Sequence, residues 1–177
     1  MNSKLDLTTI GRTSKINFPV DGIKNVPAKI DTGADSSSVW ASHLRVDDDN
    51  RLHFVLFDEG SQYYTGIEHH AKSFTVRLVR SSNGTTQIRY AVGLVVILGG
   101  KKIRGTFTLA DRSKNTYPVL VGCKLLNKKF LVDVSRGYTR PDDLKIKTGS
   151  LNRELSKNPK AFFEKYHADN QRGDVLL

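Results

Sequence analysis

A stretch of alternating residues at 73–111 constrains the fold more strongly than any other part of the chain. It reads SFTVRLVRSSNGTTQIRYAVGLVVILGGKKIRGTFTLAD, and apolar residues recur at every second position over long segments of it. A period of two places successive side chains on opposite faces of a β-strand. The Asn-Gly pair at 83–84 and the Gly-Gly pair at 99–100 favour tight turns between antiparallel strands. We therefore predict three consecutive antiparallel strands, at 73–79, 87–98 and 102–111.

Similar β-type patterns account for most of the remaining sequence before residue 144. Period-two or short apolar runs bounded by turn residues predict further strands at 14–20, 26–31, 52–57, 117–122 and 129–135. One helical turn is expected at 123–128, with the sequence CKLLNK. The fold is thus predicted to be mostly β, with little helix in this part of the chain.

The last part of the sequence has a different character. Residues 151–172 are polar and compatible with a helix. Asn158 and Pro159 suit the cap and the first position of a helix that presents Phe162, Phe163 and Tyr166 on one face. We predict a β domain at 1–143 and a basic, partly helical C-terminal tail at 144–177.

Composition narrows the classes of partner and location. The 28 Lys and Arg residues exceed the 18 Asp and Glu residues and give a net charge of +10, which favours anionic partners. Nucleic acid is not the expected partner, because basic charge alone supplies no groove-reading element. No apolar run approaches the roughly 18 residues that a membrane span needs, and the first residues lack the apolar segment of a signal peptide. Since Cys123 is the single cysteine, no internal disulfide can form, and we expect a cytoplasmic protein.

The stretch AKIDTGADSSSVW at 28–40 delivers a carboxylate from a short apolar strand into a tight turn. Asp31 is the carboxylate, Gly33 permits close approach of the backbone, and Thr32 supplies a hydroxyl that can lock the turn. An ordinary Asx turn at a strand end accounts for the same residues. The chemical alternative is peptide hydrolysis by a water held between two carboxylates that share one proton. A second Asp-Thr-Gly is absent from the sequence, so this chemistry requires a two-fold dimer that contributes one Asp31 per chain.

Several motifs in order resemble the retropepsin-like aspartic proteases, the single-domain class typified by retroviral proteases. KIDTGADSSSV is similar to their catalytic turn, VRSSNGTTQIRY to their flap hairpin, and YPVLVGCKLL to their apolar-apolar-Gly segment with its helical turn. The bacterial and archaeal family labelled "putative ATP-dependent zinc protease", often found beside ATP-grasp glutamate ligases, is more similar still. IGR, AKIDTGA, LADRSKNTYPVLVG and FLVDVS carry that resemblance, which covers residues 10 to about 138. It implies a closed, mostly antiparallel β-barrel.

The resemblance also implies roles for individual residues. Asp31 would be the catalytic aspartate, Thr32 would lock the two turns across the dimer axis, and Gly33 and Ala34 would shape the substrate floor. Asp35 would contact the substrate backbone or hold a structural arginine. The flap tip that closes over substrate would be formed by Ser82, Asn83 and Gly84, and the brace behind the catalytic turn by Val121 and Gly122.

One position departs from the family pattern. Retroviral enzymes and many members of the bacterial family carry arginine directly after the apolar-Gly motif, where this chain has Cys123. Asp35 would then lack its usual partner or borrow Arg12, Arg112 or Arg136. Cys123 lies in an apolar run without a neighbouring histidine, so we interpret it as a buried structural thiol and not as a nucleophile.

Neither a metal site nor a nucleotide site is expected. The chain has no His-Glu-x-x-His motif and no paired cysteines. In the cluster Glu68-His69-His70, adjacent strand residues would point to opposite faces, which favours exposed loop histidines over a chelating pair. LGGKKIRG has the wrong spacing for a phosphate-binding loop, so any dependence on ATP would belong to a partner ligase.

The sequence therefore predicts a homodimeric aspartic peptidase that needs no cofactor and uses Asp31 from both chains. The basic charge favours an acidic peptide or protein substrate, and the family context suggests a polyglutamate-like tail and an ATP-grasp ligase partner. The alternative is a non-catalytic module of the same fold that holds an acidic peptide or the ligase. Binding of a nucleic acid through the basic surface is the third hypothesis.

Overall fold

The computed structural model describes residues 6–80, 86–137 and 143–166. The chain divides into two compact units, residues 1–138 and 139–177. The predicted boundary between 143 and 144 stays a prediction. In the described residues, no helix is both long enough and apolar enough to span a membrane.

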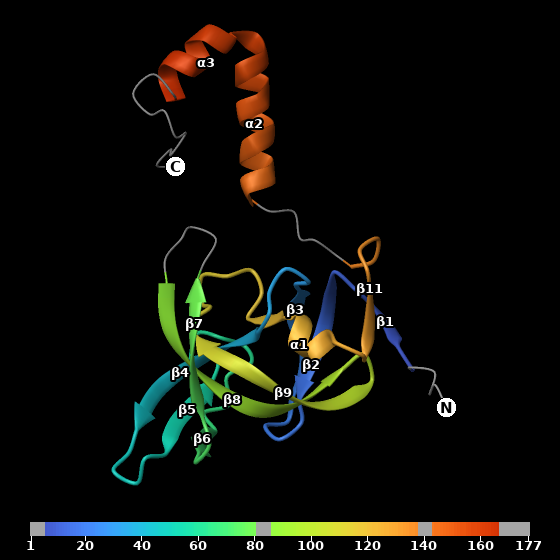
Figure 1. Cartoon of the computed structure of the whole chain (residues 1–177). Coiled ribbons are helices and arrows are strands. Elements are labelled where there is room, and N and C mark those ends of the chain that lie inside the picture. Colours follow the sequence, from blue (N-terminus) through green and yellow to red (C-terminus); the bar gives the residue numbers. More distant parts are fainter. Residues whose placement is uncertain (1–5, 81–85, 138–142, 167–177) are drawn as a thin grey trace. The chain divides into compact units, whose positions relative to one another are not determined.

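Eleven strands and one short helix build the first unit within its described residues (Figure 1). Along the chain these elements are β1 (Thr8–Gly11), β2 (Thr13–Phe18), β3 (Ile23–Ile30), β4 (Ser37–Val46), β5 (Leu52–Leu56), β6 (Glu68–Ala71), β7 (Thr75–Arg80), β8 (Thr86–Leu98), β9 (Lys101–Ala110), β10 (Val119–Val121), α1 (Cys123–Leu126) and β11 (Phe130–Asp133).

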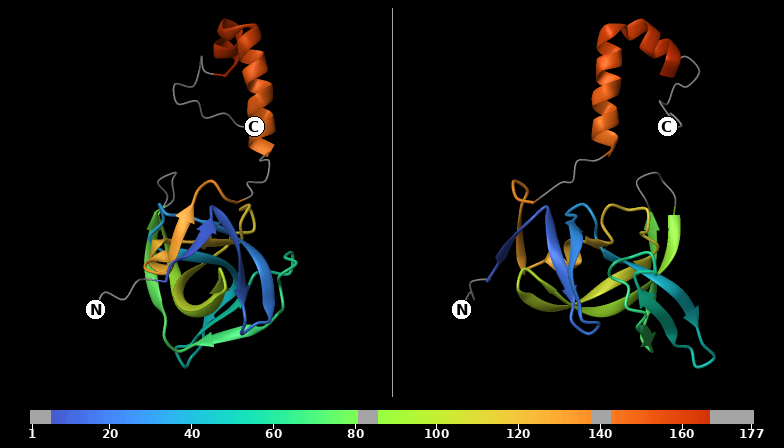
Figure 2. Two further views of the ribbon diagram at one scale, coloured as in Figure 1. Left: turned by 90° about the vertical axis from the view of Figure 1, so that its right-hand side faces the viewer. Right: turned by 180° about the vertical axis from the view of Figure 1, so that it is seen from behind.

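Six strands close into a barrel in the order β10, β3, β2, β8, β9 and β4, and the pairing of β10 with β4 completes the ring. The left view of Figure 2 shows these strands arranged around a common axis. Four of the six pairings are antiparallel, whereas β10 with β3 and β4 with β9 are parallel. The predicted mostly β, closed barrel is therefore confirmed, with two parallel pairings beside the segment that contains Asp31.

The remaining strands extend this ring. β7 pairs with the first half of β8, which continues along β9 and ends beside β2. β5 and β6 add to β4 as an antiparallel extension, in which β6 is the outermost strand. β1 and β11 form a separate parallel pair. The predicted meander at 73–111 is present, with boundaries within two residues of those expected.

Inward-facing apolar side chains fill the barrel, because strands with a period of two send every second side chain to the same face. Phe18, Phe57 and Phe107 are fully buried, and Phe18 contacts both of the other rings. Burial of each such side chain contributes on the order of 1.5–3 kcal/mol to stability. The aromatic cluster therefore anchors β2, β9 and the end of β5 to one another.

Two helices, α2 (Asp143–Lys157) and α3 (Pro159–Tyr166), make up the described part of the second unit. The predicted cap of α3 is confirmed, because the Asn158 side-chain oxygen accepts a hydrogen bond from the Ala161 amide at 3.1 Å. Glu154 joins the two helices, accepting hydrogen bonds from Lys165 at 2.7 Å and from Tyr166 at 3.2 Å. The hydrogen bond from Lys165 is the main cause of a lowered pKa of Glu154, and the hydrogen bond from Tyr166 lowers this pKa further. The predicted helix start at Asn158 and Pro159 is where α3 begins, and a further helix, α2, already starts at residue 143, before the stretch at 151–172 that the sequence marked as compatible with a helix.

Candidate active site

Asp31 lies directly after β3, at the start of a tight turn. Its amide donates a hydrogen bond to the Val121 carbonyl at 2.9 Å. Its carboxylate accepts one from the Gly33 amide at 3.0 Å, and its carbonyl accepts one from the Ala34 amide at 3.2 Å. The Asp31 side chain is 28% exposed, while Thr32 and Gly33 are exposed. The turn therefore presents a fixed carboxylate at the surface of a single chain.

Strand β10 holds this turn from behind, because its three residues lie between β3 and β4. Val119 and Val121 are fully buried, and Val121 stands beside Ile30 in parallel register. On its other side Val119 faces Val39 of β4. The strands before and after the turn are thus held by one common neighbour.

Gly122 is the point where the two segments approach most closely. A Cβ atom at this position would lie 2.6 Å from the Ser36 carbonyl oxygen and 2.7 Å from the Ala34 carbonyl oxygen. Its φ of −95° and ψ of 173° are accessible to any residue, so the requirement for glycine is purely one of space. The next amide, of Cys123, donates to the Ala34 carbonyl at 2.7 Å.

Two serines that the motif left unexplained lock the strand after the turn. The buried Ser37 hydroxyl accepts a hydrogen bond from the Gly122 amide at 3.1 Å, and the Ser37 carbonyl accepts one from the Thr108 hydroxyl at 3.2 Å. Ser38 in turn donates to the Thr108 carbonyl at 3.3 Å. Consecutive serines next to an apolar stretch could have indicated these hydrogen bonds, since buried polar groups are almost always paired.

The partner of Asp35 differs from all three arginines that the sequence suggested. Lys124 lies 2.5 Å from the Asp35 carboxylate, and its amide donates to the Asp35 carbonyl at 3.1 Å. Arg112 instead donates to the Tyr117 carbonyl at 3.1 Å, and Arg136 pairs with Asp133. Burial lowers the pKa of Arg112 below its ordinary value. The cation beside Asp35 is therefore the residue that follows Cys123, which places it one position after the arginine of the family pattern.

Cys123 is the first residue of α1 and is only partly buried. Its thiol contacts the Thr32 carbonyl oxygen at 3.0 Å. The expectation of a buried thiol is wrong, because the side chain is only partly buried and lies against the carbonyl of the exposed Thr32.

The predicted flap residues Ser82, Asn83 and Gly84 lie outside the described residues. The two strands that lead to them, β7 and β8, run up one side of the barrel in Figure 1. Three apolar side chains on these strands are more than half exposed, namely Val76, Leu78 and Ile88. Leu78 and Ile88 stand directly opposite each other in the ladder, so they form a local exposed apolar pair.

A cavity of about 230 Å³ lies next to the turn segment and is lined by Ser36 and by Lys124. Its other charged lining residues are Arg77, Arg104 and Lys129, and no carboxylate lines it among the residues that the structure describes. Lys29 adds a further cation 3.8 Å from the Asp31 carboxylate. The charged side chains that line this cavity are therefore all basic among the described residues, and one of them, Lys124, is paired with Asp35.

The histidines near residue 69 lie on strand β6 and not in a loop, so that expectation is wrong. His69 faces Asp21 at 2.5 Å and stacks on Phe54, whereas His70 lies on the opposite face. Glu68 and His70 share their face with the buried His53 of β5. Hydrogen bonds to Asp47 and then to Glu68 hold the pKa of His53 above its ordinary value.

Comparison with known families agrees with this geometry. The model of the RimB-like family, described as retropepsin-like aspartic endopeptidase RimB, matches residues 10–143. The chain belongs to this family. Asp31, its turn and the β10 brace all fall inside the matched region, whereas the family's description gives no support to the zinc-protease label.

Relatives of this RimB-like chain include longer proteins. It is 27% identical over 185 residues to a protein of Shewanella pealeana named "Probable alpha-L-glutamate ligase", and 26% identical to one of the same name from Shewanella halifaxensis. Each match covers 95% of this chain but only 40% of the relative. The chain therefore spans less than half the length of these relatives.

A solved structure supports the fold. The crystal structure of a Legionella pneumophila protein of unknown function superposes with a TM-score of 0.55 at 20% identity. The match covers 75% of this chain and 97% of that protein. The likeness shows a shared architecture for the RimB-like barrel.

Proposed function

We propose that this chain is a homodimeric aspartic peptidase whose dyad consists of Asp31 from each of two chains. The observation that carries the proposal is the Asp31 turn, which is braced by β10 and Gly122 and yet leaves Thr32 and Gly33 exposed. An exposed, rigid turn with one carboxylate is half of a dyad, and two-fold symmetry supplies the other half. Membership of a retropepsin-like aspartic endopeptidase family supports the same reading.

In this proposal the two carboxylates share one proton, because like charges so close together cannot both ionise. The ionised Asp31 takes a proton from a water molecule, and the oxygen of this water attacks the peptide carbonyl carbon. The protonated Asp31 of the second chain gives its proton to the carbonyl oxygen. Collapse of the tetrahedral intermediate then breaks the C–N bond, and the amine leaves with a proton from the dyad.

Acidic peptides are the substrate class that we propose. Among the described residues, the charged lining of the cavity beside Ser36, which adjoins the Asp31 turn, consists of Arg77, Arg104, Lys129 and the Asp35-paired Lys124. Such a cavity attracts carboxylate side chains, and arginine can bind a carboxylate through two parallel hydrogen bonds. Relatives named as glutamate ligases support a polyglutamate-like tail as substrate and an ATP-grasp glutamate ligase as functional partner.

The same basic cavity favours a second candidate, a module that holds acidic peptides without hydrolysing them. The cations that line the cavity could bind an acidic peptide even if Asp31 has no catalytic role. Binding by this module would be steeply salt-dependent, because exposed charges are screened within a Debye length of about 10 Å at 0.1 M salt.

The test compares wild type with Asp31→Asn on peptides that carry oligoglutamate tails, with product masses as the readout. Asparagine keeps the shape and an acceptor for the Gly33 amide but cannot act as general base. We expect hydrolysis to fall at least about 100-fold. Asp48→Asn, at an exposed aspartate in the turn after β4, is the matched control and should cleave normally.

Equal cleavage by wild type and Asp31→Asn would overturn the dyad. Salt-sensitive binding by wild type with no cleavage of acidic or generic peptides would favour the binding module instead. Sedimentation supplies an independent check, because a chain that stays monomeric at high concentration cannot assemble two Asp31 residues in one site.

A further inference from the structure

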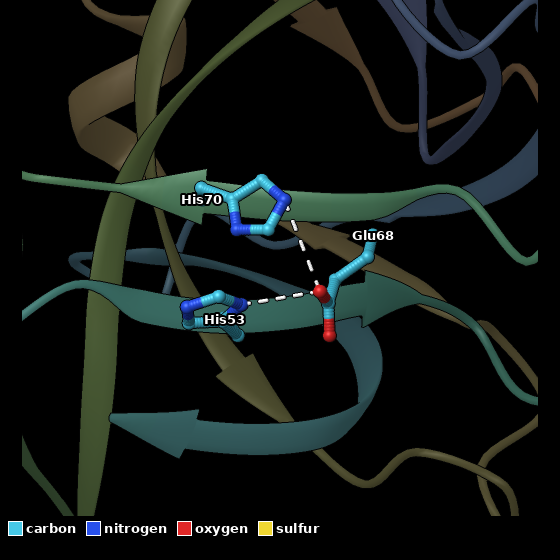
Figure 3. A group of neighbouring side chains, drawn as sticks. All are labelled: His53, Glu68 and His70. Atoms are coloured by element: carbon cyan, nitrogen blue, oxygen red, sulfur yellow. Dashed lines mark hydrogen bonds and ion pairs between the residues drawn. The ribbon is translucent and has the colours of Figure 1, made fainter. Parts of the chain in front are cut away.

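Three side chains that the peptidase chemistry does not use meet on one face of the β5–β6 pair. His53 of β5 stands directly across from His70 of β6 in the antiparallel ladder. Glu68 lies two residues before His70 and therefore on the same face of the strand. Figure 3 shows both imidazole rings directed toward the carboxylate of Glu68.

The donor atoms of this trio are already close together. His53 Nδ1 lies 3.1 Å and His70 Nε2 lies 3.8 Å from the same oxygen, Glu68 Oε2. One ligand atom from each residue falls within 4.8 Å of the other two. Ligands around a tetrahedral zinc ion, at about 2.0–2.1 Å from the metal, are about 3.4 Å apart. The trio therefore needs side-chain shifts of about an ångström, which the half-exposed His70 can make.

Asp47 orients the buried member of the trio. Its Oδ2 lies 2.7 Å from His53 Nε2, while the His53 side chain is only 8% exposed. When Asp47 holds the Nε2 hydrogen, Nδ1 can exchange its hydrogen bond with Glu68 for a bond to a metal, which is the usual arrangement behind a histidine ligand. The contact thus selects the nitrogen that faces Glu68 and His70.

Arg45 is the cation that faces the trio from β4. Its Nη2 donates to Glu68 Oε1 at 2.9 Å and to Oε2 at 3.0 Å. The Arg45 side chain is 54% exposed, so solvent weakens its repulsion of a second cation. It can keep Oε1 and orient the carboxylate while Oε2 turns to the metal.

We propose that His53, Glu68 and His70 form a binding site for a divalent transition metal, with Zn²⁺ as the ion that suits the donors. Two imidazoles and one carboxylate are a donor set that zinc accepts, with water as the fourth ligand. The bound ion would fasten the outermost strand β6 to β5. The site is separate in sequence from Asp31, and the proposal does not depend on peptidase activity.

The experiment titrates ZnCl₂ into untagged, chelator-treated full-length protein by calorimetry. We expect one zinc per chain for wild type and at least about a 10-fold weaker affinity for His70→Ala, since even an outer partner of a metal ligand contributes 10–100-fold. His43→Ala is the matched control, because it removes an exposed histidine from β4 and leaves the chain with as many histidines as His70→Ala. It should bind zinc like wild type. Asp47→Asn should weaken binding less than His70→Ala.

Two further measurements keep the result decisive. Zinc should raise the melting temperature of wild type and His43→Ala more than that of His70→Ala. The His70→Ala variant changes a half-exposed residue and retains the buried His53, so it should still fold. Anomalous scattering from zinc-soaked crystals should place the ion between the three donors. Absence of binding, equal loss in His43→Ala and His70→Ala, or an ion located elsewhere would overturn the proposal and leave these residues as a network of ion pairs.

Discussion

Gly122 offers a direct test of the link between β10 and the shape of the Asp31 turn. In Gly122→Ala the added methyl would meet the carbonyl oxygens of Ser36 and Ala34 at 2.6 and 2.7 Å, and backbone atoms cannot rotate away as a side chain can. The backbone conformation itself suits alanine, so the clash alone sets the cost. Overpacking of this kind costs about 1–3 kcal/mol. The equilibrium between folded and unfolded protein should therefore shift by roughly 5- to 150-fold.

The assay is urea unfolding of Gly122→Ala beside Gly60→Ala. A Cβ at Gly60 would meet nothing within 4 Å. Both substitutions lower the entropy of the unfolded chain in the same way, so their difference isolates the clash. If Gly122→Ala proved as stable as Gly60→Ala, the close approach of β10 to the turn would not contribute to stability as argued. Retained stability with lost cleavage would show instead that the turn moved without unfolding the barrel.

Two further predictions concern the termini of the described elements. The Ser135 hydroxyl and then its amide hold the pKa of Asp133 below its ordinary value, at 2.6 and 2.9 Å. A lowered folded-state pKa stabilises the protein above the unfolded value of about 3.8 and loses its effect as pH falls through the folded value. Wild type should therefore have a higher urea midpoint than Asp133→Asn near neutral pH, and this difference should vanish in acid. A difference that does not change with pH would contradict the prediction. In the second unit, Asn158→Ala should cost about 1 kcal/mol of α3 stability by removing the cap of the Ala161 amide. The loss of helix stability should appear as faster hydrogen exchange of the α3 amides, with Asn152→Ala as a mid-helix control. Unchanged exchange in Asn158→Ala would show that the cap does not stabilise α3.

Local patterns predicted five of the six barrel strands, because alternation and turn residues act over a few positions, but they predicted no strand at β4 or at β1. The Gly-Gly pair correctly located the β8–β9 connection, and Asn158 correctly marked the start of α3. Strand β6 was missed because its residues Glu68–Ala71 carry no alternating apolar pattern. It becomes a strand by pairing with β5, which is a tertiary contact that short-range propensity does not contain.

The site residues divide along the same line. Asp31 and Gly122 could be identified because their motifs are contiguous. Lys124 could not be assigned to Asp35, since the two meet only when β10 and α1 pack against the turn across 89 positions of sequence. His53 escaped notice for the same reason, because its neighbours Glu68 and His70 are defined by cross-strand register and not by spacing along the chain.

The three-residue strand β10 is synthesised long after the strands that it pairs with, and this delay affects when the Asp31 turn can form. It joins β3 and β4 across about ninety positions, with Val119 facing Ala28 and Val39. Contacts this distant form late and slow folding, because a long loop must close before they contribute. A growing chain therefore carries Asp31 long before it can shape the turn that holds it. In the peptidase that we propose, half of a dyad can exist only after synthesis has passed residue 122, so an incomplete chain would have no means of hydrolysing its neighbours.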